Sequence, residues 1–136
     1  KKIANVPLLA NGDIHKPWQV SEALKITNAD GVLIARGALG NPWFFKQARK
    51  MMNGEADIKI SLSERVDVIL EHARLHIGHY GERGIITFRK HLSWYFKTSK
   101  IGFDVYGIKA LREKLVRVNT YDGLKNILDE FLIVQV

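Results

Sequence analysis

The sequence contains no cysteine, and that absence excludes disulfide bonds, thiolate metal sites and a cysteine-based catalyst within this chain. It also contains no apolar run approaching the roughly 20 residues that cross a bilayer as a helix. Internal repeats and low-complexity tracts are absent as well. A chain without disulfides fits a reducing compartment, so a cytoplasmic protein that makes no membrane contact is expected.

Acidic residues are scarce between residues 83 and 117, where nine basic side chains stand against two acidic ones. The flanking segments 61–82 and 118–136 each carry a net charge of −2, although the whole chain carries +7. A basic block with acidic flanks is typical of proteins that bind a phosphate-rich partner such as RNA. The alternative is an ordinary solvated helical surface. The overall composition, 46% hydrophobic and 26% charged residues, is that of a folded globular protein.

Two short apolar runs near the N-terminus alternate with helical patterns, which is the order of a parallel α/β sheet. The runs at 6–10 and 32–35 are continuously apolar, as strands buried on both faces by helices are. Two strands alone leave both sheet edges open, so we expect strands of a larger sheet to be missing ahead of Lys1. The open edges could instead pair with another copy, exchange strands in a domain-swapped assembly, or leave residues 1–52 unstable.

Two helices are predicted in this first part of the chain. One begins near Pro17 and ends before Asn28. The other begins at Asn41 and Pro42, with the Asn side chain capping the free amides, and ends before Asn53. Two strands, each followed by a helix, fit the last two β/α units of a TIM (β/α)8 barrel.

The pattern becomes all helical after residues 53–60, which lack a clear period and are interpreted as a linker. Ser61 and Glu64 have the spacing of a capping box, and Gly81 should end the helix that they begin. Further helices are predicted at about 84–98, at about 107–118 and after Thr120. Four amphipathic helices can close one small core, so residues 61–136 should form a four-helix C-terminal bundle. The predicted fold class is therefore α/β followed by all-α.

Small and polar residues follow both predicted strands, at the end where a parallel barrel binds its ligand. The first loop begins Asn-Gly-Asp and the second Ala-Arg-Gly. Small residues let backbone amides approach phosphate oxygens, and arginine adds a charged contact. An ordinary turn is the alternative for the first loop, and a turn role is favoured over a general-base role for Asp13. The two loops predict a phosphate site made of Asn11, Gly12, Asp13, Ala35, Arg36 and Gly37.

These loops and the residues around them resemble a known family. The segments 7–14 and 29–44 are similar to the end of the catalytic barrel of tRNA-dihydrouridine synthases, especially the bacterial NifR3-like branch. The segments 88–97 and 111–112 resemble the C-terminal domain of the same family. The resemblance covers nearly the whole chain, and its barrel motif is the more specific half.

The resemblance implies an activity and its cofactors. In that family NADPH reduces FMN, a hydride passes to C6 of a uridine in tRNA, and a cysteine acid protonates C5, which yields dihydrouridine. Residues 1–52 would be the end of the FMN-binding barrel, and residues 61–136 the tRNA-binding domain. Family positions that hold the FMN phosphate, mainly through backbone amides with arginine adding charge, match Asn11, Gly12, Asp13, Ala35 and Arg36, although position 35 is more often glycine. The family's cysteine lies in the first half of the barrel, so this chain alone should be inactive.

A basic and aromatic face is predicted on the helix at about 84–98. Lys90, Trp94 and Lys97 are spaced four and three residues apart, so they share one side of that helix. Such a face can hold phosphates by charge and stack on an unpaired base or ribose. Packing of Trp94 on a neighbouring element is the alternative. The candidate RNA-binding residues are Arg89, Lys90, Trp94, Lys97, Arg112 and Arg117.

Other interpretations of the chain stay open. His72, His76 and His79 form a row that could bind zinc. No glutamate completes a His-Glu-x-x-His motif, and such rows more often pack or face solvent, so no metal is expected. The main alternative function is an FMN- or phosphate-binding TIM-barrel enzyme for a small metabolite, with a helical tail. Another is a nucleic-acid-binding helical module with non-functional barrel remnants.

Overall fold

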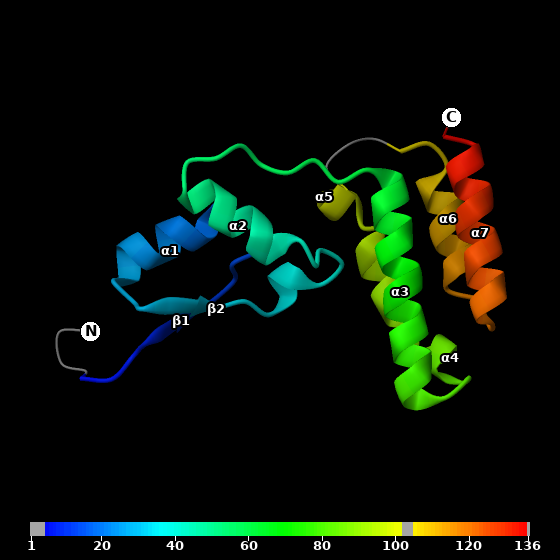
Figure 1. Ribbon diagram of the computed structural model, residues 1–136, viewed down its shortest axis with the longest axis horizontal. Helices are drawn as coiled ribbons and strands as arrows, with labels where there is room; N and C mark the ends of the chain where they lie inside the picture. The colour runs from blue at the N-terminus through cyan, green and yellow to red at the C-terminus, as the bar shows by residue number, and fades with distance from the viewer. Residues whose placement is uncertain (1–4, 102–104, 136) are drawn as a thin grey trace. The chain divides into compact units, whose positions relative to one another are not determined.

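The computed structural model describes residues 5–101 and 105–135, and the chain divides into two compact units, residues 1–59 and 60–136. The first unit combines two short strands with helices, and the second is helical (Figure 1). This supports an α/β segment followed by helices, while the TIM barrel and the four-helix bundle stay predictions. Among the described residues, every helix is too short or too polar to traverse a lipid bilayer.

The first unit is built on a parallel pair of strands. β1 spans Leu9–Asn11 and β2 spans Gly31–Leu33, with Ala10 opposite Val32. Helix α1, Gln19–Thr27, forms the crossover between the strands and packs on both of them. Parallel strands require such a crossover, which leaves the carboxyl ends of both strands at one edge of the sheet.

The expectation of strands buried on both faces is wrong for this structure. Val32 packs against a small core made by the buried side chains of Ile14, Val20, Phe44 and Ala48. Leu9 and Leu33 are instead 62% and 49% exposed. Side chains alternate along a strand, so a single covering layer buries one face and leaves the other uncovered. The strands are also shorter than the predicted runs and are displaced from them by one to three residues.

The entry into the second helix also differs from the prediction. The 3₁₀ helix η1, Arg36–Ala38, follows β2, and α2 spans Phe44–Met52. The predicted side-chain cap by Asn41 is wrong, because α2 begins at Phe44 with Trp43 at its N-cap position, and among the described residues no side chain caps it. The Asn41 amide nitrogen instead donates to Oε1 of Gln47 at 2.9 Å. The turn uses the Asn41 backbone instead, whose carbonyl accepts a hydrogen bond from the Phe44 N–H at 3.1 Å.

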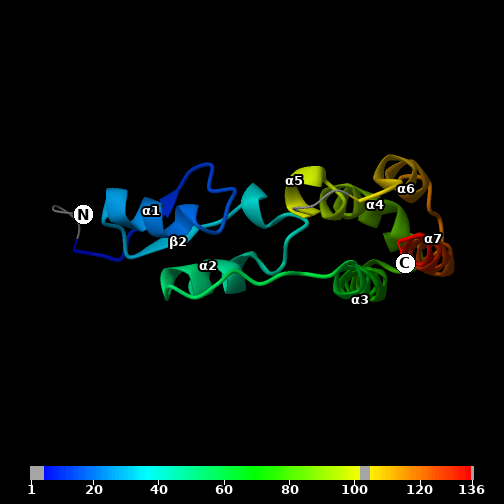
Figure 2. The same cartoon turned by 90° about the horizontal axis from the view of Figure 1, so that it is seen from above.

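The second unit contains four longer helices and one short one in its described residues. Their bounds are α3 Leu62–Tyr80, α4 Gly84–Tyr95, α5 Thr98–Ile101, α6 Ile108–Leu115 and α7 Tyr121–Ile133. Figure 2 shows α3, α6 and α7 nearly end-on, so these helices run roughly along one direction. The apolar faces of α3, α4, α6 and α7 share one core, in which Ile69, Phe88, Leu92, Leu124 and Leu128 are fully buried.

Local capping signals in the sequence set several of these helix ends. The Ser61 hydroxyl accepts a hydrogen bond from the Glu64 N–H at 3.1 Å, which confirms the cap predicted for α3. α3 ends at Gly81, whose φ of 75° lies in the region that favours glycine. The Thr120 hydroxyl accepts from the Gly123 N–H at 3.0 Å and begins α7. The predicted helix at 84–98 is divided into α4 and α5.

One buried cation ties three helices of this unit together. Arg65 of α3 is only 3% exposed. Its guanidinium donates to the backbone carbonyls of Tyr95, at 3.3 Å, and Lys100, at 3.2 Å. These carbonyls lie at the ends of α4 and α5, where helical carbonyls lack partners and carry partial negative charge. Burial lowers the pKa of Arg65, but an arginine starts so high that it stays charged.

Replacing Arg65 by methionine should destabilise the helical unit. The Arg65→Met variant keeps an unbranched apolar stem but leaves two helix-end carbonyls without this donor. We expect the free energy of unfolding to fall by about 2–3 kcal/mol, measured by urea denaturation.

The matched control is Arg74→Met on the same helix. Arg74 is exposed, and its guanidinium bonds only to the neighbouring Glu71 in the contacts described for it, so its loss should cost less than about 1 kcal/mol. Equal losses in the two variants would contradict a special role for the buried guanidinium.

Candidate functional site

The six residues predicted to hold a phosphate meet in one hollow. It lies where β1 and β2 end, has a volume of about 190 Å³, and is lined by Asn11, Gly12, Asp13, Ile14, His15, Leu33, Ala35, Arg36 and Gly37. Sites that enclose a whole drug-sized ligand have roughly 300–1,000 Å³. The hollow therefore suits a small charged group better than a complete nucleotide. What it binds stays a prediction.

The loop after β1 makes a sharp turn at two positions of positive φ. Gly12 has a φ of 153° and Asp13 a φ of 38°. Aspartate is among the few residues with a side chain that tolerate such a conformation. The turn brings Asp13 Oδ1 to within 2.6 Å of the Arg36 guanidinium, which donates to it. This geometry favours a turn and pairing role for Asp13 over the general-base alternative.

The pair of Asp13 and Arg36 joins the two loops that face each other across the hollow. Both side chains are exposed, at 78% and 67%, so the pair itself contributes at most about 1 kcal/mol to stability. A guanidinium carries five N–H donors in a planar fork. Arg36 can therefore hold Asp13 and still offer donors to an anion in the hollow.

Gly37 allows the two loops to approach each other closely. It is buried, and a Cβ atom at this position would overlap the backbone carbonyl oxygen of Ile14 and crowd the side chain of Ile34. Only glycine lets η1 lie against the segment that follows β1 at this distance. The shape of the hollow thus depends on the absence of one methyl group.

A methyl group at Gly37 should loosen the hollow. In the Gly37→Ala variant either η1 or the segment at Ile14 must shift, at a cost of about 1–3 kcal/mol. Hydrogen exchange followed by mass spectrometry should show faster exchange of backbone amides in residues 31–38.

Gly78→Ala provides the matched control. Gly78 lies within α3, where a Cβ would meet nothing within 4 Å. This substitution should leave exchange in residues 31–38 unchanged and be neutral or slightly stabilising. Unaltered exchange in both variants would mean that the close approach at Gly37 has no structural consequence.

Two of the three residues of the predicted basic and aromatic face, Lys90 and Trp94, lie on α4, whereas Lys97 lies beyond the end of that helix at Tyr95. Lys90 and Lys97 are exposed, and Trp94 is half-buried. The Lys97 ammonium lies 4.9 Å from the centroid of the Trp94 ring, within the range of a cation–π contact. The half-buried Trp94 thus agrees in part with both predictions for it. One portion of the side chain packs inside the unit, and another remains open to solvent, where it could stack on a base or ribose.

Arg89 differs from the other candidate RNA-binding residues. Its guanidinium donates to the carbonyl of Val118 at 2.7 Å, to the carbonyl of Arg117 at 3.5 Å and to the side-chain oxygen of Asn119 at 2.5 Å. These bonds hold α4 to the connection between α6 and α7. Because its Nε and Nη2 donors are used inside the unit, Arg89 has a structural role here. Arg117 itself is exposed.

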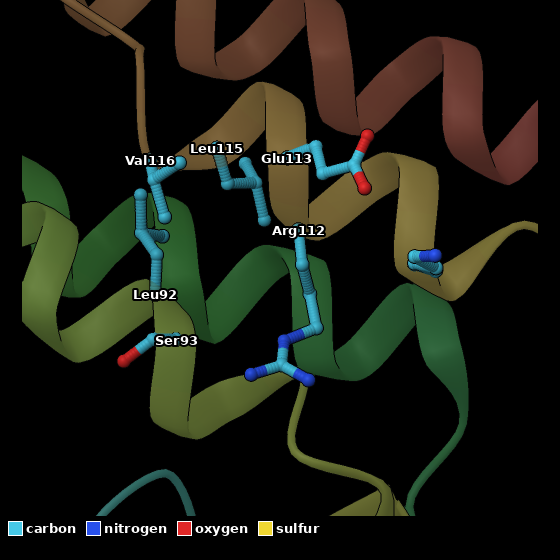
Figure 3. Close-up of a pocket in the computed structure, with 7 residues that line it drawn as sticks. Leu92, Ser93, Arg112, Glu113, Leu115 and Val116 are labelled. Carbon is cyan, nitrogen blue, oxygen red and sulfur yellow. The ribbon is translucent and has the colours of Figure 1, made fainter.

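A pocket between α4 and α6 adds residues that the sequence did not single out. It has a volume of about 270 Å³, and its lining consists of Leu92, Ser93, Lys109, Arg112, Glu113, Leu115 and Val116 (Figure 3). Apolar side chains line part of it, while Arg112 and Lys109 supply positive charge. The three-residue spacing of Lys109 and Arg112 on one helix face is the signal that could have included Lys109.

The chain is similar to known proteins over nearly its whole length. The family model described as dihydrouridine synthase matches residues 1–135. The chain is 34% identical over 131 residues to the probable tRNA-dihydrouridine synthase 1 of Synechocystis. This match covers 96% of the chain and 35% of the relative. It is 36% identical over 129 residues to the probable tRNA-dihydrouridine synthase of Mycobacterium tuberculosis, and this match covers 93% of the chain and 32% of the relative. The chain thus spans about a third of the length of these relatives.

Proposed function

The chain belongs to the dihydrouridine synthase family, and from that membership we propose that it is part of a flavin-dependent enzyme that reduces uridine in tRNA to 5,6-dihydrouridine. In this proposal the first unit holds the phosphate of FMN and the helical unit binds tRNA. NADPH is the reductant. The proton donor is a cysteine outside this chain, which has none. Bound FMN would supply the hydride chemistry, and the residues of this chain would bind and orient it.

The observation that carries the cofactor half of the proposal is the meeting of two loops at the carboxyl ends of β1 and β2. Loops at this end of parallel strands bind ligands in barrel enzymes, and phosphates are commonly held after the last strands. The hollow offers the right chemistry: exposed backbone at Gly12, two loops that approach closely at Gly37, and the Arg36 guanidinium. Its small volume fits a phosphate, with the rest of the flavin lying elsewhere.

The pairing of Asp13 with Arg36 determines which groups would attract that phosphate. A carboxylate beside a phosphate is repulsive unless a cation neutralises it, and Arg36 does so at 2.6 Å. The net charge of the pair is zero, so backbone N–H groups and the remaining Arg36 donors would supply most of the attraction. Arg36 therefore serves the phosphate in two ways, by donating to it and by neutralising Asp13.

Replacing Arg36 by methionine should weaken FMN binding to the whole enzyme about 10- to 100-fold, which corresponds to about 1.5–3 kcal/mol. Flavin fluorescence during titration of the apoenzyme measures the dissociation constant. Riboflavin has no phosphate, so its affinity should be the same in Arg36→Met and in the unmodified enzyme.

Arg49→Met is the matched control, because Arg49 is an exposed arginine of α2 that does not line the hollow. It should bind FMN normally. A loss of riboflavin affinity equal to the loss of FMN affinity in Arg36→Met would contradict the phosphate assignment and indicate a general distortion.

The tRNA half of the proposal rests on the face made by Lys90, Trp94 and Lys97 together with the pocket beside it. Exposed lysines neutralise phosphates, and a partly open indole can stack on an unpaired base. Ser93, which directly precedes Trp94 on α4, lines the pocket, and Arg112 lines the same pocket from α6 (Figure 3). Charge, an aromatic surface and a cavity are therefore contributed by α4, by Lys97 just beyond its end and by α6.

Changing Lys90 and Lys97 together to glutamate should weaken binding of unmodified tRNA to this chain at least about tenfold. The salt dependence should also become shallower, with the slope of log K against log salt reduced by about two, because two phosphate contacts are lost. Fluorescence anisotropy between about 50 and 200 mM salt measures both quantities.

The charge-matched control changes Lys114 and Lys125 to glutamate. These lysines face Glu130 and Asp129 and lie outside the proposed face, while the change in net charge is the same. Their replacement should have the smaller effect. Equal effects of the two double changes would indicate binding of any polyanion and favour the alternative, a barrel enzyme that acts on a small phosphorylated metabolite.

A further inference from the structure

Three histidines from two helices converge in the helical unit. His72 and His76 lie one turn apart on α3, and His91 joins them from α4. One ring nitrogen of each lies within 4.8 Å of those of the other two. The ring centroids of His72 and His76 are 5.1 and 5.6 Å from that of His91. All three side chains are half-buried, so a small ion can reach them from solvent.

These three histidines differ from the row predicted from sequence spacing, which was His72, His76 and His79. His79, the third member of the predicted row, lies with its ring 4.6 Å from that of Tyr80 and does not belong to the cluster. His91 takes its place although it is fifteen residues beyond His76 in the sequence. Two histidines four residues apart on one helix face are a recurrent pair of zinc ligands, and a third from a neighbouring helix completes a three-nitrogen face.

Hydrogen bonds from neighbouring side chains orient two of the rings. His72 Nδ1 lies 3.0 Å from the hydroxyl of Tyr95, which leaves its Nε2 available. The Thr87 hydroxyl donates its only hydrogen to the carbonyl of Gly84 at 2.9 Å, so it accepts from His76 Nε2 at 2.8 Å. His76 then keeps a lone pair on Nδ1. Metal-binding histidines are commonly held in this way through the nitrogen that does not bind the metal.

The electrostatic setting keeps these rings in the form that binds metals. Desolvation by burial lowers the pKa of His72, His76 and His91, and the positive charge of Lys90 lowers the pKa of His76 and His91 further. The imidazoles are therefore mostly neutral near pH 7, and only a neutral imidazole offers a lone pair to a cation.

We propose that His72, His76 and His91 form a binding site for a divalent transition metal ion of the zinc type. Tetrahedral Zn–N bonds of about 2.0–2.1 Å place the nitrogens about 3.3 Å apart, so the three nitrogens must close up by as much as about 1.5 Å, which side-chain rotations supply. Solvent would complete the tetrahedral set. The ion would cross-link α3 to α4 next to Lys90, and this assignment replaces the expectation that the chain has no metal site.

The alternative is that the rings only pack around Phe88, whose ring centroid lies 4.8 Å from that of His72 and 5.5 Å from those of the other two. Packing and metal binding differ in their dependence on the third histidine. A packed cluster gains nothing from added zinc, whereas an ion that binds only the folded unit raises its melting temperature by mass action.

The test uses the 136-residue chain without any histidine tag. Co²⁺ absorbance, followed by displacement with Zn²⁺, measures stoichiometry and affinity, and calorimetry measures the melting temperature with zinc or with magnesium. We expect one ion per chain, a higher melting temperature with zinc only, and zinc binding more than about tenfold weaker in His91→Gln and in His76→Gln. His79→Gln is the matched control and should bind zinc as the unmodified chain does.

Circular dichroism of each variant establishes that it is folded, and two different ligand variants guard against a folding defect in one. The proposal is overturned if zinc binds His79→Gln as weakly as His91→Gln, or if the unmodified chain binds no tighter than the two ligand variants. Neither flavin nor tRNA enters the experiment, so its outcome is independent of the proposed enzymatic function.

Discussion

The parallel pairing of β1 with β2 is the constraint on which the first unit depends. Antiparallel strands could be joined by a tight turn, but this pair needs α1 as a crossover, and the crossover returns the chain so that both strands end at one edge. Loops that are more than twenty residues apart in sequence therefore face each other. The bond between Arg36 and Asp13 and the close approach at Gly37 then follow from the fold.

In the helical unit the contact between α3 and α4 has the corresponding importance. Phe88 and Leu92 fill its buried side. Along the same contact lie the buried Arg65, which holds the end of α4, and the three histidines, which occupy a half-buried strip. The side of α4 that remains exposed carries Lys90, and Lys97 follows the end of this helix. Different positions around α4 thus contribute to the core, to the Arg65 contact through the Tyr95 carbonyl, to the histidine cluster through His91 and to the basic face through Lys90.

Signals that act over three or four residues could be read from the sequence, whereas contacts over longer distances could not. The Ser61 cap and the glycine stop at Gly81 depend on immediate neighbours, and both were predicted correctly. The Asn41 cap was wrong because α2 begins three residues later, at Phe44, with Trp43 at its N-cap position. Arg65 bonds to carbonyls 30 and 35 residues away, so no local pattern reveals it.

Within the proposed enzyme the two units would recognise phosphate by different physical means. In the hollow, Asp13 cancels the charge of Arg36, so selectivity comes from shape and backbone donors at fixed positions and should depend little on salt. On the helical unit, exposed lysines and arginines of the basic block have few acidic residues in their own segment, so attraction is long-ranged and screened by salt. A cofactor that stays bound requires the first kind of recognition. A large RNA that must arrive and leave in every cycle is better served by the second, because charge accelerates encounter without locking one geometry.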